Sequence, residues 1–177
     1  HELLEEQISI QRTKIEGIRP VVLHSLNEIV IRQMDLKTLS LKISIHNQFL
    51  EEFVGDGVLI ATTVGSTAYN LSVHGAIVDS SLHTLQLTPL SPLNNKAYRN
   101  LLNSLIVPEH KTITIMPSGT TQDKNADLMV VVDGTVKKYH NVRRIQTTVD
   151  KRRITYLKLP HHSFYHKVHD KFLGDNK

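Results

Sequence analysis

Several features on which other protein classes depend are missing from this sequence. It contains no cysteine, so no disulfide framework is available. It has no run of about 18 apolar residues, which a membrane-spanning helix would need. The nucleotide-binding patterns Gly-x-x-x-x-Gly-Lys and Gly-x-Gly-x-x-Gly are both absent. These absences exclude a disulfide scaffold, a membrane span and two common phosphate-binding loops.

The first residues, HELLEEQISI, also lack the basic and then apolar organisation of a signal peptide. We therefore expect a cytoplasmic protein without a membrane partner, or a protein of an organelle matrix if the source is eukaryotic. The chain has 177 residues, of which 40% are hydrophobic and 21% charged. This composition suits a single globular domain over residues 1–177.

The formal net charge is +4 and the pI about 9.3, which favours anionic partners but identifies none. Five cations are concentrated in VRRIQTTVDKRR, Val142 to Arg153. One interpretation is a nucleic-acid-binding surface. The other is the solvent face of two adjacent strands, because Ile145 and Val149 supply apolar positions between the charges. We prefer the second and expect no nucleic-acid partner, since no aromatic stacking platform is interleaved with the charges.

Alternating apolar and polar residues, interrupted at short intervals by turn residues, predict a mainly β fold. The segment from Leu41 to Ala61 predicts three strands, with turns at His46-Asn47 and at Gly55-Asp56-Gly57. LMVVVDGTVKKY predicts a hairpin around Asp133-Gly134, and His110 to Gly119 predicts another strand. We expect a multi-stranded β-sandwich with a few short helices.

Helices are expected at few places. GSTAYNLS can begin one, because Ser66 or Thr67 can cap its first turn. The segment Lys96 to Leu105 suits a helix or an extended conformation. SFYHKVHDKFLG places Phe164 and Phe172 on one face, which predicts an amphipathic C-terminal helix. The opening residues are expected to hold the end of a helix followed by a strand.

The stretch GDGVLIATTVGSTAYNLS, Gly55 to Ser72, ends an apolar strand in small residues and hydroxyls. Glycines on both sides of Asp56 allow a tight turn that leaves a carboxylate at the mouth of the strand. Thr67 and Ser72 offer short hydroxyls, and Tyr69 offers a flat face for an aromatic ring. This set suits a nucleoside pocket, and the alternative is an ordinary turn followed by a core tyrosine.

A second motif, SLNEIVI, places Asn27 and Glu28 at the head of an apolar strand. The adjacent amide and carboxylate can bind the polar edge of a base or the hydroxyls of a ribose. Alone, such a pair usually marks a turn. Together with the first motif it favours a nucleoside pocket.

LNEIVI, GDGVLIATTVGSTAYNLSVHGAIV and LTPLSPLNNKAYRNLLNSLIVP, in this order and spacing, resemble the C-terminal domain of the NAD kinases. The resemblance covers nearly the whole chain from about Gln7. It implies part of an enzyme that transfers a phosphoryl group from ATP or polyphosphate to the 2′-hydroxyl of the adenosine ribose of NAD. It also implies a divalent metal such as Mg²⁺ for the complete enzyme, and a homodimer or homotetramer with NAD bound near the subunit interface.

Carried over by position, the resemblance implies an NAD site built from several segments. Its residues are Asn27, Glu28, Asp56, Thr67, Ala68, Tyr69, Asn70, Ser72, Ser91 and Leu93. Asp56, Ser91 and Leu93 lie where the resemblance implies contacts involving a neighbouring subunit.

The sequence departs from the family's pattern at several positions. Thr63 and Val64 replace a proline and a hydroxyl residue, Val54 stands where several members have arginine, and no ligand contact can be assigned after Asp133. The family's Gly-Gly-Asp-Gly-Thr motif, with the proposed base and the phosphate loop, has no match, and Asp56 and Asp133 lie in predicted turns instead. We expect no catalytic residue here, and an isolated chain that binds NAD without turnover. The alternative is a non-catalytic module that senses NAD or a related nucleotide.

Histidines offer two further candidates. His162, His166 and His169 would share a helix face, as a metal site requires. No cysteine or well-placed carboxylate completes the set, so we expect no metal site. His74, a lone histidine beside a glycine, we interpret as structural.

Overall fold

The computed structural model of the chain describes residues 3–35, 37–118, 125–159 and 163–174. Its strands are β1 (Leu4–Glu16), β2 (Val21–Ser25), β3 (Glu28–Gln33), β4 (Leu39–Ile45), β5 (Gln48–Gly55), β6 (Gly57–Thr62), β7 (Thr84–Leu90), β8 (Leu105–Pro108), β9 (Ile113–Pro117), β10 (Ala126–Val132), β11 (Thr135–Val142) and β12 (Arg144–Lys158). The helical segments are the 3₁₀-helix η1 (Val64–Thr67), α1 (Tyr69–Ser72) and α2 (Phe164–Phe172). None of the helices in these ranges is long and apolar enough to cross a membrane.

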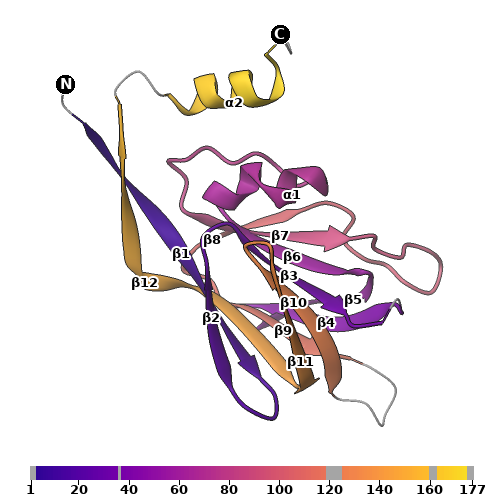
Figure 1. Cartoon of the computed structure of the whole chain (residues 1–177). Coiled ribbons are helices and arrows are strands. Elements are labelled where there is room, and N and C mark those ends of the chain that lie inside the picture. Colours follow the sequence, from indigo (N-terminus) through magenta and orange to yellow (C-terminus); the bar gives the residue numbers. More distant parts are fainter. Residues whose placement is uncertain (1–2, 36, 119–124, 160–162, 175–177) are drawn as a thin grey trace.

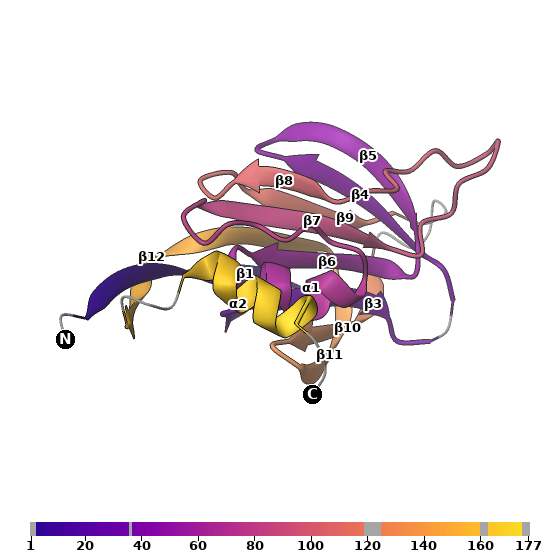
Figure 2. The same ribbon diagram turned by 90° about the horizontal axis from the view of Figure 1, so that it is seen from above.

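Two six-stranded sheets pack against each other, as Figures 1 and 2 show from two sides. The strand order is β2-β1-β12-β9-β4-β5 in the first sheet and β11-β10-β3-β6-β7-β8 in the second. The predicted mainly β sandwich with a few short helices is therefore confirmed.

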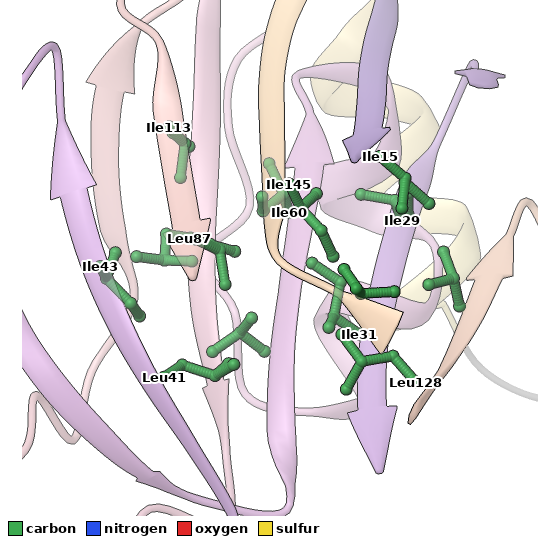
Figure 3. Packing of buried hydrophobic residues seen from close by; sticks show 14 of the residues in the cluster. Ile15, Ile29, Ile31, Leu41, Ile43, Ile60, Leu87, Ile113, Leu128 and Ile145 are labelled. Atoms are coloured by element: carbon green, nitrogen blue, oxygen red, sulfur yellow. The ribbon is translucent and has the colours of Figure 1, made fainter. Parts of the chain in front are cut away.

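The core lies between the two sheets and is made mainly of branched aliphatic side chains, together with Phe53 (Figure 3). Ile29 and Ile31 of β3 and Ile60 of β6 face Leu41 and Ile43 of β4, and all five are fully buried. Successive strand residues point to opposite faces of a sheet, so every second residue reaches this core. The burial of apolar surface here is the main source of stability of the fold.

The residues between those core positions form a second, smaller cluster on the outer face of the second sheet. It contains Val30, Leu59, Ala61 and Leu90, and Val73 from the end of α1 packs against it. Strands β3 and β6 are therefore covered on both faces. This outer layer holds the α1 segment in place, and α1 carries much of the predicted site.

Two-residue turns join the predicted hairpins. His46 and Asn47 have φ of 48° and 67°, and Asp133 and Gly134 have φ of 43° and 80°. Positive φ at both central residues is the conformation that closes a tight hairpin. The hairpins β4–β5 and β10–β11 are thus confirmed at the predicted positions.

Several expectations of local structure were wrong. Residues from Leu4 onward belong to the long strand β1 and contain no helix end. The basic stretch does not lie on two adjacent strands, because Arg144–Lys158 is one strand. Lys96 to Leu105 contains no helix, which leaves the extended alternative. Neither Ser66 nor Thr67 caps a helix, because no side chain supplies the N-cap hydrogen bond of η1 or α1.

Strands β1 and β12 form a long ribbon that extends beyond the sandwich. They pair from Glu16 and Arg144 to Leu4 and Lys158, and the far end of the ribbon projects from the sheets in both views. Helix α2 follows this ribbon, and its N-cap Ser163 accepts a hydrogen bond from the amide of His166. The predicted C-terminal helix is confirmed, and it buries none of its residues.

A pair of matched valines in one hairpin tests the core assignment. Val130 of β10 is 0% exposed and Val136 of β11 is 55% exposed. Val130→Ala is expected to lower the free energy of unfolding by about 2 kcal/mol, because about 0.8 kcal/mol is lost per buried CH₂ and a cavity remains. Val136→Ala should stay within about 0.5 kcal/mol. Urea unfolding measures both, and equal effects would contradict the sandwich packing.

Candidate functional site

The two sequence motifs meet where β6 leaves the second sheet. The amide of Thr62 donates to the Asn27 carbonyl at 2.9 Å, and its hydroxyl donates to the Leu26 carbonyl at 2.6 Å. Gly65 then crosses the same turn so closely that a Cβ would lie 2.0 Å from the carbonyl oxygen of Asn27. Only glycine permits this approach. The structure thus brings the Asn27-Glu28 motif under the start of the Gly65–Tyr69 segment.

The Asn27-Glu28 turn is held by a residue distant in sequence. The carboxylate of Asp133, in the β10–β11 turn, accepts hydrogen bonds from three successive amides: Leu26 at 2.7 Å, Asn27 at 2.8 Å and Glu28 at 3.1 Å. The amide of Asp133 donates in return to the Glu28 carbonyl at 3.2 Å. A carboxylate that accepts several amides fixes their geometry through charge-assisted bonds. Asp133 therefore determines the shape of the turn.

Glu28 is a buried carboxylate with unused bonding capacity. Its residue is only 6% exposed, and its Oε2 has no hydrogen-bond partner among the described residues. Burial raises the pKa of Glu28, the nearby negative charge of Asp133 raises it further, and a hydrogen bond from the Tyr69 amide opposes both effects. An unpartnered buried acceptor is costly to keep, so such a group is a candidate to bind a donor from a ligand.

Asn70 occupies a different kind of position from its neighbours. Its side chain is fully buried, donates to the Ser66 carbonyl at 3.3 Å, and accepts from the Thr88 hydroxyl at 2.7 Å. Gly75 closes over it, since a Cβ there would lie 2.2 Å from the Asn70 amide. Asn70 therefore fixes the α1 segment onto β7, and in this arrangement its side chain is occupied by protein groups.

Tyr69, Ser72 and Ser91 line one hollow of about 480 Å³. Its other walls include Arg32 of β3 and the segment around Ser104. Tyr69 is 44% exposed although it lies on a short helix against the sheet. A half-exposed aromatic ring beside hydroxyls can stack on a flat ligand and leave its polar edge to be read by hydrogen bonds.

Asp56 lies in an adjacent hollow of about 190 Å³ that shares Arg32 with the first. Its carboxylate is 3.9 Å from the Arg32 guanidinium, which is a weak, partly exposed pair. Leu93 is held nearby by its amide, which donates to the Val54 carbonyl at 2.8 Å, and its side chain is exposed. Both side chains are thus available on the surface.

Thr67 faces a third hollow, of about 340 Å³, between η1, the ribbon and α2. Its carbonyl accepts a hydrogen bond from Lys171 of α2 at 3.0 Å, and Val64 lines the same hollow. Ala68 joins this segment to Tyr69, and its amide donates to the Gly65 carbonyl at 3.0 Å. The predicted residues therefore do not surround a single closed pocket. Five of them face three neighbouring hollows, and Asn27, Glu28 and Leu93 line none of the three.

A larger hollow of about 740 Å³ lies on the first sheet, away from this unit. Its cations Lys42, Arg143 and Arg144 are accompanied by Glu16 and Glu52, and it contains none of the predicted site residues. Within the described ranges no three histidine or acidic side chains come together to hold a metal ion. His162, one of the three histidines considered above, lies outside those ranges.

Sequence analysis missed three residues that shape the site: Asp133, Arg32 and Lys171. The Asp-Gly turn was evident, but the target of the Asp133 carboxylate is about a hundred residues away in sequence. Arg32 and Lys171 lie in elements that were recognised only by their apolar pattern. The contact of Asp133 with the Leu26–Glu28 turn follows from the pairing of β3 with β10, which the sequence did not reveal.

Comparison with known proteins places this arrangement in context. Residues 26–152 match the family model described as the ATP-NAD kinase C-terminal domain. The chain is 35% identical over 175 residues to the NAD kinase of Streptococcus agalactiae and 36% identical over 171 residues to that of Finegoldia magna. These alignments cover 96% and 95% of the chain but 62% of each relative. The chain thus spans about three fifths of the length of these curated relatives.

Solved structures show the same fold at lower sequence identity. Yeast NADH kinase complexed with NADH superimposes with a TM-score of 0.80 at 22% identity, over 97% of this chain and 51% of that one. An NAD kinase from Archaeoglobus fulgidus in complex with ATP gives 0.68 at 22% identity, over 87% and 55%. The predicted fold is therefore shared with proteins of this kind.

The role of Asp133 is tested by amide hydrogen exchange. In Asp133→Asn the amides of Leu26, Asn27 and Glu28 should exchange at least about tenfold faster, because a hydrogen bond to a charged group contributes about 1.5–3 kcal/mol. Asparagine tolerates the positive φ of this turn, so the hairpin itself should persist. Asp127→Asn, which removes a similar carboxylate from the same hairpin, should leave these three amides unchanged. Unchanged exchange in Asp133→Asn would refute the assigned role.

The raised pKa of Glu28 has a consequence for stability. A carboxyl group whose pKa is higher in the folded than in the unfolded chain makes stability fall as the pH rises between the two values. The ordinary value is 4.5 and the pKa of Glu28 is raised above it. Glu28→Gln should therefore be more stable than the parent chain at pH 7, and this advantage should vanish below about pH 4.

Urea midpoints measured from about pH 3 to 8 provide the test, with Glu52→Gln at an exposed position of β5 as the control. A Glu28→Gln variant that is less stable than the parent at pH 7 would show that the carboxylate is stabilised in the folded chain.

Proposed function

The chain belongs to the family of ATP-NAD kinase C-terminal domains, and from this we propose that it is the NAD-binding part of an NAD kinase. The complete enzyme would phosphorylate the 2′-hydroxyl of the adenosine ribose of NAD to give NADP. The observation that carries the proposal is the contact between the Tyr69 amide and the buried Glu28 carboxylate, whose Oε2 has no partner among the described residues. Such a group, next to an exposed aromatic ring, suits a ligand with hydroxyl donors and a flat base.

In this proposal each residue has a role that follows from its surroundings. Tyr69 packs on the adenine ring, and the hydroxyls of Thr67 and Ser72 bind polar atoms of the adenosine. Glu28 accepts a hydrogen bond from a ligand hydroxyl or amide, and Asn27 lies beside it. Ala68 leaves space for the ligand next to the main chain.

Asn70 contributes indirectly, because its side chain is bonded to Ser66 and Thr88. We assign it the role of a positioning residue that holds Tyr69 and Ser72 in place.

Catalysis is assigned to parts outside this chain. Phosphoryl transfer needs positioning of the donor and stabilisation of the charge on the transferred group, and the residues described here supply neither a metal cluster nor a glycine-rich phosphate loop. A divalent metal such as Mg²⁺ and a donor, ATP or polyphosphate, therefore belong to the complete enzyme. The isolated chain, which we take as one domain over residues 1–177, is proposed to bind NAD without turnover.

We also propose that the protein assembles as a homodimer or homotetramer. Asp56, Ser91 and Leu93 are exposed at the edge of the site, where contacts with a second copy would border a bound ligand. Nucleic acid is not proposed as a partner, because Arg152 and Arg153 are paired with Asp150 and Glu109. A cytoplasmic location completes the proposal.

The second candidate is a module that senses NAD without taking part in an enzyme. The buried Glu28 carboxylate fits either function, since both need the ligand to be bound. Joining this chain to the domain of a relative that contains the Gly-Gly-Asp-Gly-Thr motif distinguishes them. Kinase activity of the joined protein supports the enzyme, and the absence of activity from a correctly folded protein supports the sensor.

Tyr69 gives the direct test of NAD binding. Stacking of a base on an aromatic side chain contributes about 1–3 kcal/mol, so Tyr69→Ala should weaken NAD binding by about five- to a hundredfold. Isothermal titration measures this, with adenosine and ATP as comparison ligands. Tyr98→Ala is a matched control, because Tyr98 is also 44% exposed but does not line the hollow beside Tyr69. An unchanged affinity in Tyr69→Ala would remove the ring from the site.

A further inference from the structure

We propose that the ion pair between Glu109 and Arg153 is a positioning element that fixes the free end of the β1–β12 ribbon and so keeps α2 against the Thr63–Thr67 segment. Glu109 and Arg153 are therefore positioning residues for one wall of the site. The inference deepens the proposed function, but the contacts that carry it do not depend on the ligand.

The ribbon changes register at one point. Ser9 pairs with Arg153, whereas Gln11 pairs with Val149. Two steps along β1 thus correspond to four along β12, so residues 150–152 bulge out of the ladder. A bulge bends and twists the strand that contains it. The bulge at residues 150–152 therefore sets the direction in which the free end of the ribbon leaves the sandwich.

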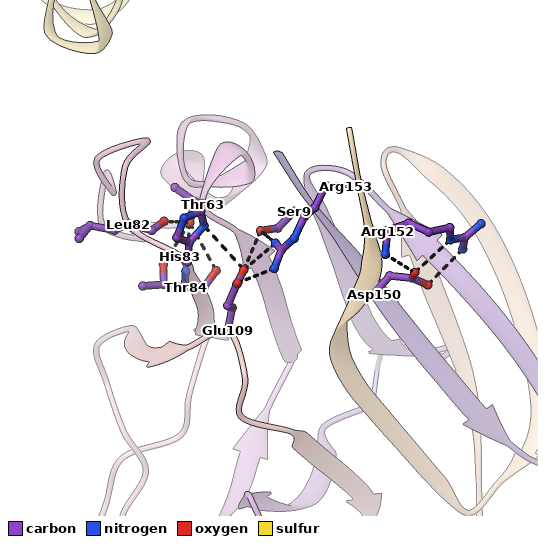
Figure 4. A network of polar contacts seen from close by, with 9 residues as sticks. All are labelled: Ser9, Thr63, Leu82, His83, Thr84, Glu109, Asp150, Arg152 and Arg153. Carbon is purple, nitrogen blue, oxygen red and sulfur yellow. Dashed lines mark hydrogen bonds and ion pairs between the residues drawn. The ribbon is translucent and has the colours of Figure 1, made fainter. Parts of the chain in front are cut away.

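On one side of the bulge, a bidentate ion pair joins Arg153 of the ribbon to Glu109, the residue that follows β8 (Figure 4). The guanidinium of Arg153 donates to both carboxylate oxygens of Glu109, at 2.9 and 2.6 Å. Ser9 of β1 donates to the same carboxylate at 2.7 Å. Arg153 lowers the pKa of Glu109 through these hydrogen bonds. Because both charged groups are partly shielded from solvent, the pair is expected to hold its geometry better than an exposed one.

A second set of contacts holds the bulge itself. Asp150 accepts from the Arg152 guanidinium at 3.0 and 3.1 Å and lies 3.0 Å from the ring nitrogen of His24 on β2. These contacts tie the bulge to its own sheet. The Glu109 pair is different, because it ties the ribbon to the second sheet.

Hydrogen bonds at the start of β7 connect Glu109 to the segment that begins at Thr63. The amide of Glu109 donates to the His83 carbonyl at 3.1 Å, just before β7. The hydroxyl of Thr63 donates to the neighbouring Leu82 carbonyl at 2.6 Å and lies 3.3 Å from the Thr84 hydroxyl. The segment from His83 to Thr84 is therefore bonded both to Glu109 and to the residue that precedes Val64 (Figure 4).

Beyond the bulge, the ribbon supplies one wall of the hollow next to Thr67. Ile8 and Tyr156 come from the ribbon, Val64 and Thr67 from η1, and Phe164 from α2. Helix α2 buries no residue of its own. Its contacts with the body include the bond from Lys171 to the Thr67 carbonyl at 3.0 Å and a hydrogen bond from Tyr165 to Asp79. The Ser81 hydroxyl and, after it, Tyr165 lower the pKa of Asp79 to about 2.

Exposed contacts of this kind contribute little by themselves. The position of α2 therefore depends on the free end of β12 against which it packs, where Lys167 of α2 lies 5.4 Å from the ring centroid of Tyr156. If that end moved, the Thr67 carbonyl would lose its partner on α2 and the hollow would open.

The absence of cysteine allows a direct test in the whole chain. Spin labels on Phe49→Cys in β5 and Leu173→Cys after α2, both exposed positions, report the distance between α2 and the body by pulsed electron resonance. The parent pair should give one narrow distance distribution. Glu109→Gln should broaden it, and Arg153→Lys, which keeps the charge but loses the fork, should broaden it less.

Two further variants decide the interpretation. Glu16→Gln breaks a similar ion pair of β1 on the body side of the bulge, and it should leave the distribution narrow. The exchange of Glu109→Arg with Arg153→Glu should restore it. An unchanged distribution in Glu109→Gln would overturn the proposal, and so would broadening that the exchange does not reverse, since the defect would then be general rather than due to the pair.

Titration with NAD separates this inference from the proposed function. Weaker NAD binding in Glu109→Gln, by several-fold, together with the broadened distribution would support both. Failure of the parent chain to bind NAD, with the distance results as expected, would refute the proposed function and leave the positioning role supported.

Discussion

The carboxylate of Asp133 is the contact on which the arrangement of the site depends. It accepts hydrogen bonds from three consecutive amides of the Leu26–Glu28 turn. The Asn27 carbonyl of this turn accepts a hydrogen bond from the Thr62 amide and lies directly against Gly65. The hairpin β10–β11, the first residue of β3 and the end of β6 are therefore joined through one charged group. Because β3 and β6 are packed on both faces, this junction rests on well-buried strands, which would suit a binding site of precise geometry.

Glu28 shows that the same junction carries an electrostatic penalty. Its carboxylate is buried near Asp133, and one oxygen has no partner among the described residues. A fold selected only for stability would place an apolar or amide side chain there, since an unpaired buried charge is unfavourable. Groups held in this way concentrate at binding and catalytic sites. The Tyr69 amide bonds to the Glu28 carboxylate, so this group is already oriented before any ligand binds.

Local signals in the sequence were sufficient for the hairpins and for the C-terminal helix, because Asn47, the Asp133-Gly134 pair and the spacing of Phe164 and Phe172 act within a few residues. They failed at the start of the chain, where Leu4–Glu16 pairs with Arg144–Lys158, a partner that no local pattern reveals. For the site, residue types in two motifs predicted which segments would be close. The motifs could not predict that Asn70 is buried or that Asp133 organises the turn, because both roles follow from contacts across the folded sheet.

The two ends of the site are held by different physical means, and this difference has a functional meaning. The Asn27-Glu28 side is held by three hydrogen bonds to Asp133 and continues into β3, which is buried on both faces, so its displacement would disturb the sheet. The α2 side rests on exposed contacts and on one partly shielded ion pair at a bulge, so it can be displaced at a smaller free-energy cost. A firmly held face that we propose to bind the ligand is thus opposed by a face that is held less firmly. Under the proposed function, displacement of the α2 side would open the hollow beside Thr67 to a ligand.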